Sequence, residues 1–389
     1  MLSKLSLSLT PSPTVTLDSR VKIMQSEGIP VINLGVGEPD FDTPKHIQKE
    51  AIVKMREGFT HYSQVAGITE LRKVISDKFM KDNNISYELS EVMVGMGSKP
   101  LLYLAYLSLL DKNDEVLIPI PAWNTFAEQV KICGGKSVFI ALKPPFKLTA
   151  VDVEKKITKR TKILLLNSPS NPTGAMIDHP ELENIAKLAI KYGFYIISDE
   201  IYEKLVYSSK HISIASLSKK IKQQTITVNG MSKAYAMTGW RIGYAGGPVN
   251  VINAMVGLQS QIASSAVTFI QHGAIEALGG NQKPLISMHE EFIARRKYII
   301  TSLKSLSGIT IIEPEGAFYV FASIERLLGK KYKTSAVWCE ALLEQQRIAV
   351  VPGEAFFYPG YFRLSFAASL QNLKKAVLGI ERFIKENYD

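Results

Sequence analysis

The alternation of short apolar segments with helical patterns constrains the fold of this chain more than any other feature. The segments with the composition of buried strands are 115–119, 137–141, 162–166, 194–197 and 225–228. Helical patterns such as 180–191 separate several of them. This arrangement is typical of an α/β fold with a mostly parallel central sheet covered by helices on both faces. Since ligands of such folds bind beyond the carboxyl ends of the strands, we expect the functional residues there.

The last third of the chain predicts a second, smaller α+β domain. Its helical patterns are 283–306, 335–345 and 370–386. Its strand-like segments are 309–312, 317–321 and 362–366. At 389 residues the chain is long enough for one large domain with a smaller companion.

Composition argues against several classes of function. The formal net charge is +10, but acidic residues are interleaved with the basic ones, so we expect no nucleic-acid partner. Cys133 and Cys339 lie far apart without a Cys-x-x-Cys motif, so we predict neither disulfides nor a metal site, and we expect a reducing cytoplasm. No apolar run approaches the roughly 18 residues of a membrane helix. The N-terminus lacks the apolar core of a signal peptide.

Three predicted strands are followed by side chains that suit a ligand. Trp123 offers a flat ring for stacking, although a core tryptophan would look the same. Asn171 lies in an Asn-Pro-Thr-Gly turn whose rigid backbone could aim the amide, and a purely structural turn is the alternative. Asp199 ends a buried strand, where a carboxylate needs either a cation such as a pyridinium nitrogen or a helix to cap.

Two glycine turns would let the backbone approach a ligand closely. Gly97 and Ser98 follow a predicted strand and open a helix, where free N–H groups and the helix dipole favour a phosphate. Pro100 stands where a dinucleotide fingerprint needs a third glycine, which argues against a nicotinamide site. Gly37 lies in the turn at 35–39, which could equally be a plain loop.

The stretch 230–241 pairs a lysine with an arginine. The Lys233 amine can hold an aldehyde as a Schiff base if its pKa is lowered, and the planar Arg241 side chain matches phosphate oxygens. This is the pairing that an aldehyde cofactor with a phosphate tail needs, although an ordinary surface lysine is the alternative. Arg363 is a charge inside an apolar strand pattern, so it should face a ligand carboxylate or an internal acidic partner.

Taken together, these motifs resemble the class I aminotransferases, which have fold type I and depend on pyridoxal 5′-phosphate. The resemblance rests on Asn-Pro-Thr-Gly at 171–174, Ser-Asp-Glu-Ile-Tyr at 198–202, Ser-Lys at 232–233 with Arg241, and Arg-Leu-Ser-Phe at 363–366. It extends from about residue 12 to the C-terminus. The expected domains are an N-terminal segment of the small domain, a large cofactor-binding domain and a small C-terminal domain, at 1–45, 46–285 and 286–389.

The resemblance implies the residues that bind the cofactor. Lys233 would hold pyridoxal phosphate as a Schiff base and then move the proton between the substrate Cα and the cofactor, while Asp199 would keep the pyridine nitrogen protonated. Asn171 and Tyr202 would bond the phenolic oxygen of the ring. The stacking ring and the phosphate contacts would be Trp123, Arg241, Gly97, Ser98, Ser232 and, from the neighbouring subunit of a homodimer with shared sites, Tyr62.

One departure from the family pattern concerns the phosphate. Many members carry a serine three residues before the lysine, whereas this chain has Gly230 there. Ser232 is the substitute that the sequence offers. The alternative for Tyr62 is that its side chain is exposed to solvent, in the polar segment between two predicted helices, and binds nothing.

Substrate contacts follow from the same resemblance. Arg363 would bind the substrate α-carboxylate, with Asn171, Trp123 and the Gly37 backbone nearby. The most similar branch is the bacterial aspartate and prephenate aminotransferases, in which the counterpart of Lys99 binds the distal carboxylate, assisted by hydroxyls near Ser12 and Thr14. A solvated lysine is the alternative for Lys99, but the dipole at a helix N-terminus disfavours a cation there and so favours an anionic partner.

We therefore predict amino transfer from L-aspartate to 2-oxoglutarate by a ping-pong mechanism. Alternatives within the same fold are an aromatic, alanine or prephenate aminotransferase and a C–S β-lyase, which would need no oxo-acid acceptor. A regulator that keeps the fold is the alternative from another class. Because the family-like region begins by about residue 12, we expect no appended DNA-binding domain.

Overall fold

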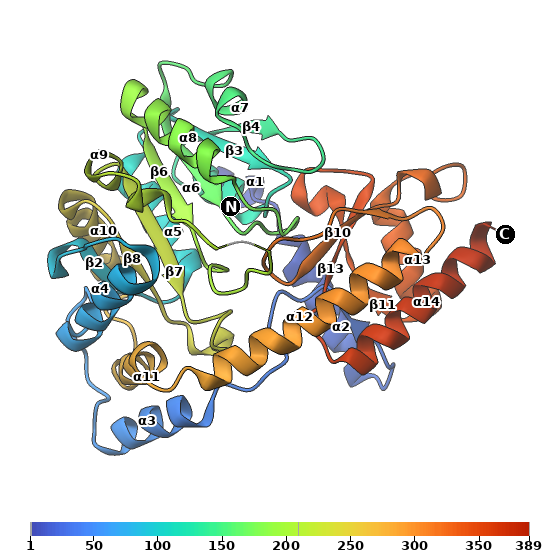
Figure 1. Cartoon of the computed structure of the whole chain (residues 1–389), viewed down its shortest axis with the longest axis horizontal. Helices are drawn as coiled ribbons and strands as arrows, with labels where there is room; N and C mark the ends of the chain where they lie inside the picture. Colours follow the sequence, from blue (N-terminus) through green and yellow to red (C-terminus); the bar gives the residue numbers. More distant parts are fainter. Residues whose placement is uncertain (1, 209, 389) are drawn as a thin grey trace.

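A seven-stranded sheet forms the centre of the molecule in the computed structural model, which describes residues 2–208 and 210–388 (Figure 1). Its strand order is β2-β8-β7-β6-β5-β3-β4. The strands are β2 (Val92–Gly95), β3 (Glu115–Ile120), β4 (Lys136–Ala141), β5 (Thr161–Asn167), β6 (Tyr195–Asp199), β7 (Thr225–Gly230) and β8 (Gly243–Gly246). Strand β8 runs antiparallel to both neighbours, whereas the pairs among β3 to β7 run parallel. The predicted, mostly parallel sheet is confirmed.

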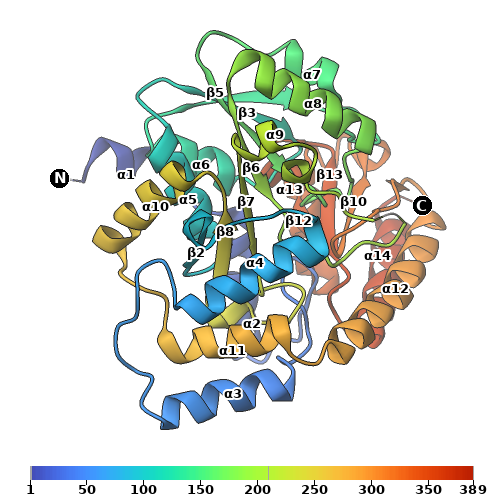
Figure 2. The same ribbon diagram turned by 60° about the vertical axis from the view of Figure 1, so that its left-hand side comes forward.

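Helices cover both faces of this sheet, which explains why its strands are apolar at almost every position. In β5, Ile163 and Leu165 pack in one core with α5, while Leu164 and Leu166 pack in another with α8. The surrounding helices are α3 (Lys45–Arg56), α4 (Thr69–Asn83), α5 (Ser98–Leu109), α6 (Thr125–Ile132), α7 (Ala150–Glu154), α8 (His179–Tyr192), α9 (Lys219–Lys222), α10 (Val249–Ile262) and α11 (Thr268–Gly279). Figure 2 shows α3 and α11 side by side, away from the edge that carries α7 and α8.

A second group of elements surrounds a four-stranded antiparallel sheet with the order β12-β13-β10-β9 (Figure 1). Its strands and helices are β9 (Thr310–Ile311), β10 (Tyr319–Ser323), β12 (Val351–Pro352), β13 (Tyr361–Ser365), α12 (Lys283–Lys304), α13 (Ser335–Gln346) and α14 (Leu370–Tyr388). The N-terminal part of the chain joins this group, because β1 (Ile32–Asn33) pairs in parallel with β11 (Ile348–Ala349). The helix α2 (Pro13–Ser26) lies beside it, and the short α1 (Lys4–Ser8) precedes α2.

Some elements give no clear sequence signal. Helix α2 buries only Val21 and so has no apolar stripe. Strand β8 begins and ends in glycine, which disfavours strands in general. A Cβ at Gly243 would lie 2.8 Å from the Ser98 backbone nitrogen, so this close approach of β8 to the start of α5 requires glycine.

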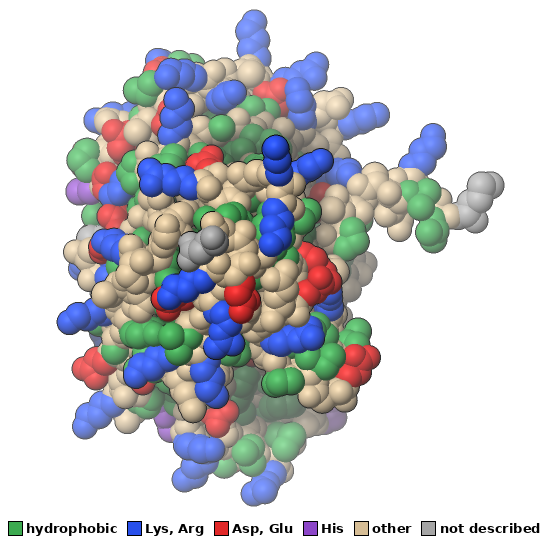
Figure 3. All heavy atoms as spheres, turned by 90° about the vertical axis from the view of Figure 1, so that its right-hand side faces the viewer, with side chains coloured by type: hydrophobic (Ala, Val, Ile, Leu, Met, Phe, Trp, Pro, Cys, Tyr) green, Lys and Arg blue, Asp and Glu red, His purple; other side chains and the backbone are tan. Residues whose placement is uncertain are grey.

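The surface carries mixed charge. On the face drawn in Figure 3, Lys and Arg side chains are spread over the surface with acidic side chains between them. Within the described residues, no helix combines the length and the apolar character needed to cross a membrane.

Candidate active site

A cleft of about 360 Å³ opens where β5, β6 and β7 end and where the segment after β1 meets β10 and β13. All the predicted site residues except Gly97 and Tyr62 line this cleft. The lining residues are Thr14, Gly37, Ser98, Lys99, Trp123, Phe126, Asn167, Asn171, Asp199, Ile201, Tyr202, Ser232, Lys233, Arg241, Tyr319 and Arg363.

Lys233 follows β7 and points into the cleft. Its Nζ donates a hydrogen bond to the Gly37 carbonyl at 2.6 Å. Burial lowers the pKa of Lys233 to about 8, Glu38 opposes this shift, and the cations Arg363 and Arg241 add to it. The free amine is therefore far more populated near neutral pH than in an ordinary lysine, which favours a nucleophilic role.

Asp199 is a buried carboxylate at the end of β6, with 4% of its surface exposed. Burial raises its pKa to about 7, although a hydrogen bond from the Ile201 backbone at 3.3 Å opposes the shift. Since Asp199 caps no helix and forms no ion pair among the described residues, the carboxylate still needs a cation.

Arg363 lies in the middle of β13 and is 2% exposed. It donates to Asn171 Oδ1 at 2.8 Å and to the Gly35 carbonyl, and its guanidinium carbon lies 4.3 Å from the centre of the Tyr319 ring. Among residues 2–208 and 210–388, no carboxylate lies within ion-pair distance of this guanidinium. The geometry therefore favours a ligand carboxylate over an internal salt bridge.

The start of α5 forms an anion cradle with Arg241. Gly97 has a φ of +93°, and a Cβ there would lie 2.7 Å from Arg241 Nη2. Arg241 is held by the Thr238 carbonyl at 3.2 Å. The helix N-terminus and the arginine thus present several donors to one position. Ser232 is 6% exposed and lines the same cleft.

The family departure at Gly230 has a packing reason. A Cβ at Gly230 would lie 3.1 Å from Gly243 Cα on the neighbouring strand β8. A serine here would crowd the backbone of β8, so the phosphate contact that other members gain at this position must come from elsewhere.

Lys99 lines the cleft, with its Nζ 4.5 Å from the centre of the Trp123 ring. Burial, followed by Arg241, lowers the pKa of Lys99. No described carboxylate lies within ion-pair distance of it. Thr14 lines the same cleft and shares a hydrogen bond with Ser12 between their hydroxyls at 3.0 Å. The lining of the cleft therefore includes a cation at Lys99 and a hydroxyl at Thr14.

Tyr319 is a site residue that the sequence did not predict. Its hydroxyl lies 2.8 Å from that of Tyr202, and both side chains are buried. Burial raises the pKa of both phenols. In sequence, Tyr319 is one aromatic residue of an apolar strand pattern, so no signal separated it from the core.

Tyr62 lies outside this cleft, in the loop after α3, with 91% of its surface exposed. Within one chain, Tyr62 therefore does not contribute to the lining of the cleft.

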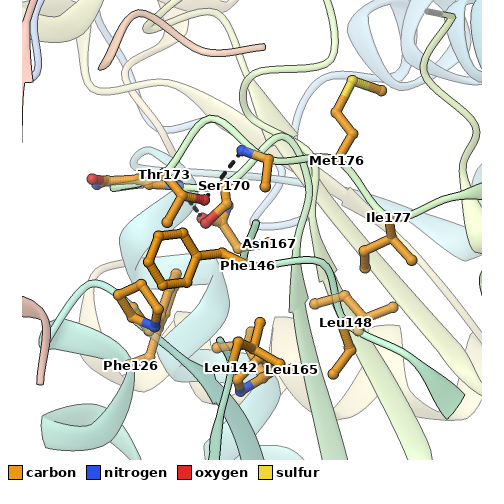
Figure 4. Close-up of a pocket in the computed structure, with 16 residues that line it drawn as sticks. Phe126, Leu142, Phe146, Leu148, Leu165, Asn167, Ser170, Thr173, Met176 and Ile177 are labelled. Carbon is orange, nitrogen blue, oxygen red and sulfur yellow. Dashed lines mark hydrogen bonds between the residues drawn. The ribbon is translucent and has the colours of Figure 1, made fainter. Parts of the chain in front are cut away.

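A smaller cavity of about 40 Å³ is lined in part by the turn that carries Ser170 and Thr173 (Figure 4). The side chains of Phe146, Leu142, Leu148 and Leu165 face it in Figure 4. It has room for only a few water molecules, and its lining is mostly apolar. The larger cleft is therefore the site that suits a charged ligand.

Comparison with known proteins identifies the family. The model of the family described as aminotransferase class I and II matches residues 29–380. The chain belongs to this family. It is therefore an enzyme that transfers amino groups, and it has the fold of the pyridoxal phosphate-dependent aminotransferases, as predicted.

Relatives and solved structures agree with this assignment. The chain is 42% identical to the aspartate aminotransferase of Bacillus sp. (strain YM-2), over 97% of each chain, and 43% identical to a probable aspartate/prephenate aminotransferase of Aquifex aeolicus, also over 97% of each chain. The structure of the aspartate aminotransferase from Rhizobium meliloti matches with a TM-score of 0.94 and 40% identity, over 98% of each chain. The enzyme from Thermus thermophilus with maleate matches with a TM-score of 0.94 and 38% identity, over 98% of this chain and 99% of the other.

Proposed function

We propose that this aminotransferase binds pyridoxal 5′-phosphate and moves the amino group of L-aspartate to 2-oxoglutarate by a ping-pong mechanism. One observation carries the proposal. Asp199 ends β6 and Lys233 follows the neighbouring strand β7, and both side chains face one cleft. Burial raises the pKa of Asp199 to about 7 and lowers that of Lys233 to about 8. This is the combination of a free amine and a buried acid that an aldehyde cofactor with a basic ring nitrogen needs.

The residues present fit this cofactor. Within residues 2–208 and 210–388 no cation lies within ion-pair distance of Asp199, and a protonated ring nitrogen would supply one. The cradle at Gly97 has no room for a Cβ beside Arg241. Lys233 would hold the aldehyde carbon. The remaining contacts would be Trp123 on the ring face, Asn171 and Tyr202 on the phenolic oxygen, and Ser98, Ser232 and Arg241 on the phosphate. When bound, the cofactor supplies an electron sink for the bond that breaks at Cα.

The protein's own groups bind the substrate and move the proton. Arg363 binds the α-carboxylate, with the Asn171 amide and the Gly37 backbone beside it. The Lys233 amine, once free, takes the proton from Cα and later returns it, which its lowered pKa permits at neutral pH.

Lys99 supports aspartate as the substrate. It is a partly buried cation with no described carboxylate partner, and Thr14 lies at the same cleft. The similar enzyme from Thermus thermophilus was solved with maleate, which is a dicarboxylate. Prephenate is a second candidate, because it is also a dicarboxylate and the Aquifex aeolicus relative carries its name. Aromatic amino acids, alanine and a cysteine conjugate with an uncharged sulfur substituent carry no second carboxylate for Lys99 to bind.

An absorbance experiment tests the function. Protein loaded with pyridoxal phosphate should lose its cofactor band when L-aspartate is added alone, and 2-oxoglutarate should restore it. Lys99→Gln should raise KM for aspartate by about 10-fold and leave KM for alanine unchanged. Conversion by phenylalanine or alanine but not by aspartate would overturn the substrate, and failure to bind the cofactor would overturn the role of Lys233.

We propose a homodimer with shared active sites. Exposed apolar side chains on and near α3, including Ile52, Met55 and Phe59, support it, as does the exposure of Tyr62. The Tyr62→Ala variant and the Lys233→Ala variant should each have little activity alone. When the two variants are mixed, unfolded and refolded together, activity should return. In a mixed dimer one site has both residues intact, so about a quarter of all sites should recover. No recovery on mixing would contradict shared sites.

We also propose that residues 1–45 and 286–389 form the small domain and residues 46–285 the large one. The parallel pairing of β1 with β11 supports this division. A cytoplasmic location is proposed as well, and the free thiols of Cys133 and Cys339 support it.

A further inference from the structure

The segment after β1 lines the cleft with Gly37 and is bonded to the turn that carries Lys233. We call residues 35–43 the crossing segment and residues 231–241 the lysine turn. Thr43 Oγ1 donates to the Ala236 carbonyl at 2.6 Å and accepts from Trp240 Nε1 at 2.9 Å. These bonds fix the far end of the crossing segment.

The near end of the crossing segment is fixed by Gly37 and Glu38. The Gly37 carbonyl accepts from Lys233 Nζ, and a Cβ at Gly37 would lie 2.4 Å from the Tyr319 hydroxyl, so the backbone is packed between the two. The next residue, Glu38, accepts at Oε1 from the Thr238 hydroxyl at 2.6 Å. Through this bond a side chain of the crossing segment holds the lysine turn five residues beyond Lys233.

The other carboxylates of the crossing segment differ from Glu38. Asp40 pairs with Arg295 on α12 at 2.6 Å and so faces away from the lysine turn. Asp42 is exposed. Around the Lys233 amine the charged groups are Glu38 and Asp199, which are acidic, and Arg363 and Arg241, which are basic. Of the two acids, Asp199 is the one that the proposed cofactor would engage, which leaves Glu38 as the anion that balances the arginines.

We propose that Glu38 is a positioning residue for Lys233: its carboxylate, tied to Thr238, keeps the Gly37 carbonyl on the lysine amine and keeps a negative charge beside that amine. The inference rests on the role of Lys233 proposed above. Glu38 does not touch the reacting atoms. It sets how basic the amine is and where the amine points when it is free.

The test measures the amine itself in cofactor-free protein. The rate at which acetic anhydride modifies Lys233 is followed by mass spectrometry of its peptide between pH 6 and pH 10. Glu38→Gln keeps a hydrogen-bond acceptor but removes the charge, so the titration midpoint of Lys233 should fall and its acetylation at pH 7 should become about three- to ten-fold faster. Asp42→Asn removes a nearby charge that makes no contact with the lysine turn, and it should leave the curve unchanged.

A second variant separates the position of the charge from the charge itself. Thr238→Val keeps the shape of the side chain but removes the hydroxyl that holds Glu38, so the midpoint should move in the same direction by a smaller amount. A curve for Glu38→Gln that matches the wild type, or a shift equal to that of Asp42→Asn, would overturn the proposal. A shift in Glu38→Gln without any in Thr238→Val would overturn the positioning role.

The loaded enzyme gives an independent readout. If wild-type protein takes up pyridoxal phosphate, the pH at which its cofactor band titrates should fall in Glu38→Gln and in Thr238→Val, and kcat should change more than KM for aspartate. If the wild type takes up no cofactor, the proposed function fails, whereas the acetylation curves still decide the role of Glu38.

Discussion

Strand β6 separates two groups of buried charge that differ in how they are paired. Ser198 and Asp199 are neighbours in the strand, so their side chains point to opposite faces. On the cleft side, Asp199 and Arg363 lack ion-pair partners among the described residues. On the other side, Glu200, Glu203, Lys78, Asn83 and His211 form a network in which each charged group has one.

The bonds of the second group are short and numerous. Lys78 forms an ion pair with Glu203 and donates to Asn83 at 2.7 Å, and Asn83 donates to Glu203 at 2.7 Å. Glu200 accepts from the Ser198 and Ser213 hydroxyls at 2.9 and 2.7 Å and lies 3.0 Å from His211 Nε2. We call these seven side chains the paired network.

The contrast indicates what each group is for. The ligand atoms of Glu200, Glu203 and His211 lie within 4.8 Å of one another, close enough for a metal ion, but Lys78 already occupies Glu203. A buried ion pair makes the loss of either partner costly to the fold, whereas a buried charge without a partner suits the binding of a ligand of opposite charge.

The largest effect is expected from Lys233→Ala. Activity should fall by about 10⁴-fold or more, because both the covalent attachment and the proton transfer are lost. The free energy of unfolding of the cofactor-free protein should stay the same or rise, since a desolvated amine is removed. Kinetics and denaturant unfolding measure the two quantities. A large loss of stability would mean that Lys233 has a structural role, as the charged residues of the paired network do.

The next largest effect is expected from Lys78→Met, which leaves Glu203 buried without its cation. Burial raises the pKa of Glu203, but Lys78 and His211 outweigh it and hold the value at about 2. The variant should lose about 3–5 kcal/mol of unfolding free energy in urea at pH 7. The folded fraction should keep its kcat. The loss should shrink as pH falls below 4.5 and disappear near the folded pKa of about 2, where the wild-type Glu203 carboxylate is protonated as well. A variant that keeps its stability but has a low kcat would contradict this prediction, because Lys78 would then serve activity rather than the fold.

Arg363→Lys should have an intermediate effect. Lysine keeps the charge but cannot donate to Asn171, Gly35 and a ligand carboxylate in one plane, so kcat/KM should fall by about 100-fold. Stability should change little, and steady-state kinetics together with thermal unfolding would show both. Equal losses in both measurements would indicate a structural role for Arg363.

The smallest effect is expected from pH through His211. Burial lowers the pKa of its imidazole, but Glu200 and Glu203 outweigh it, so the folded value lies above 6.5. The stabilisation from this pair is complete below pH 6.5 and disappears as pH rises through the folded value. Unfolding free energies of the wild type and of His211→Gln should therefore converge with rising pH. Parallel curves would show that His211 is not charged in the paired network.

Much of the cleft could be predicted from the sequence because its residues stand at strand ends. Asp199 ends one apolar strand and Asn171 follows another, and strand ends meet at one edge of a parallel sheet. The paired network gave no such signal, because Lys78 looks like any lysine of a polar helix face and its partner Glu203 lies far along the chain. Tyr319 and the bond between Glu38 and Thr238 escaped for the same reason: each depends on contacts between distant segments rather than on local pattern.

The pairing of β1 with β11 has a consequence for synthesis. Ile32 pairs with Ile348, so the strand that leads into Gly37 must wait for more than three hundred further residues to be translated. At roughly 5–20 residues per second this delay is of the order of 15–60 s. The seven strands of the central sheet are complete once residue 246 has left the ribosome. During its last interval on the ribosome the nascent chain can therefore already bond Glu38 and Thr43 to the lysine turn, but it still lacks the strand pairing at Ile32 that anchors the segment before Gly37.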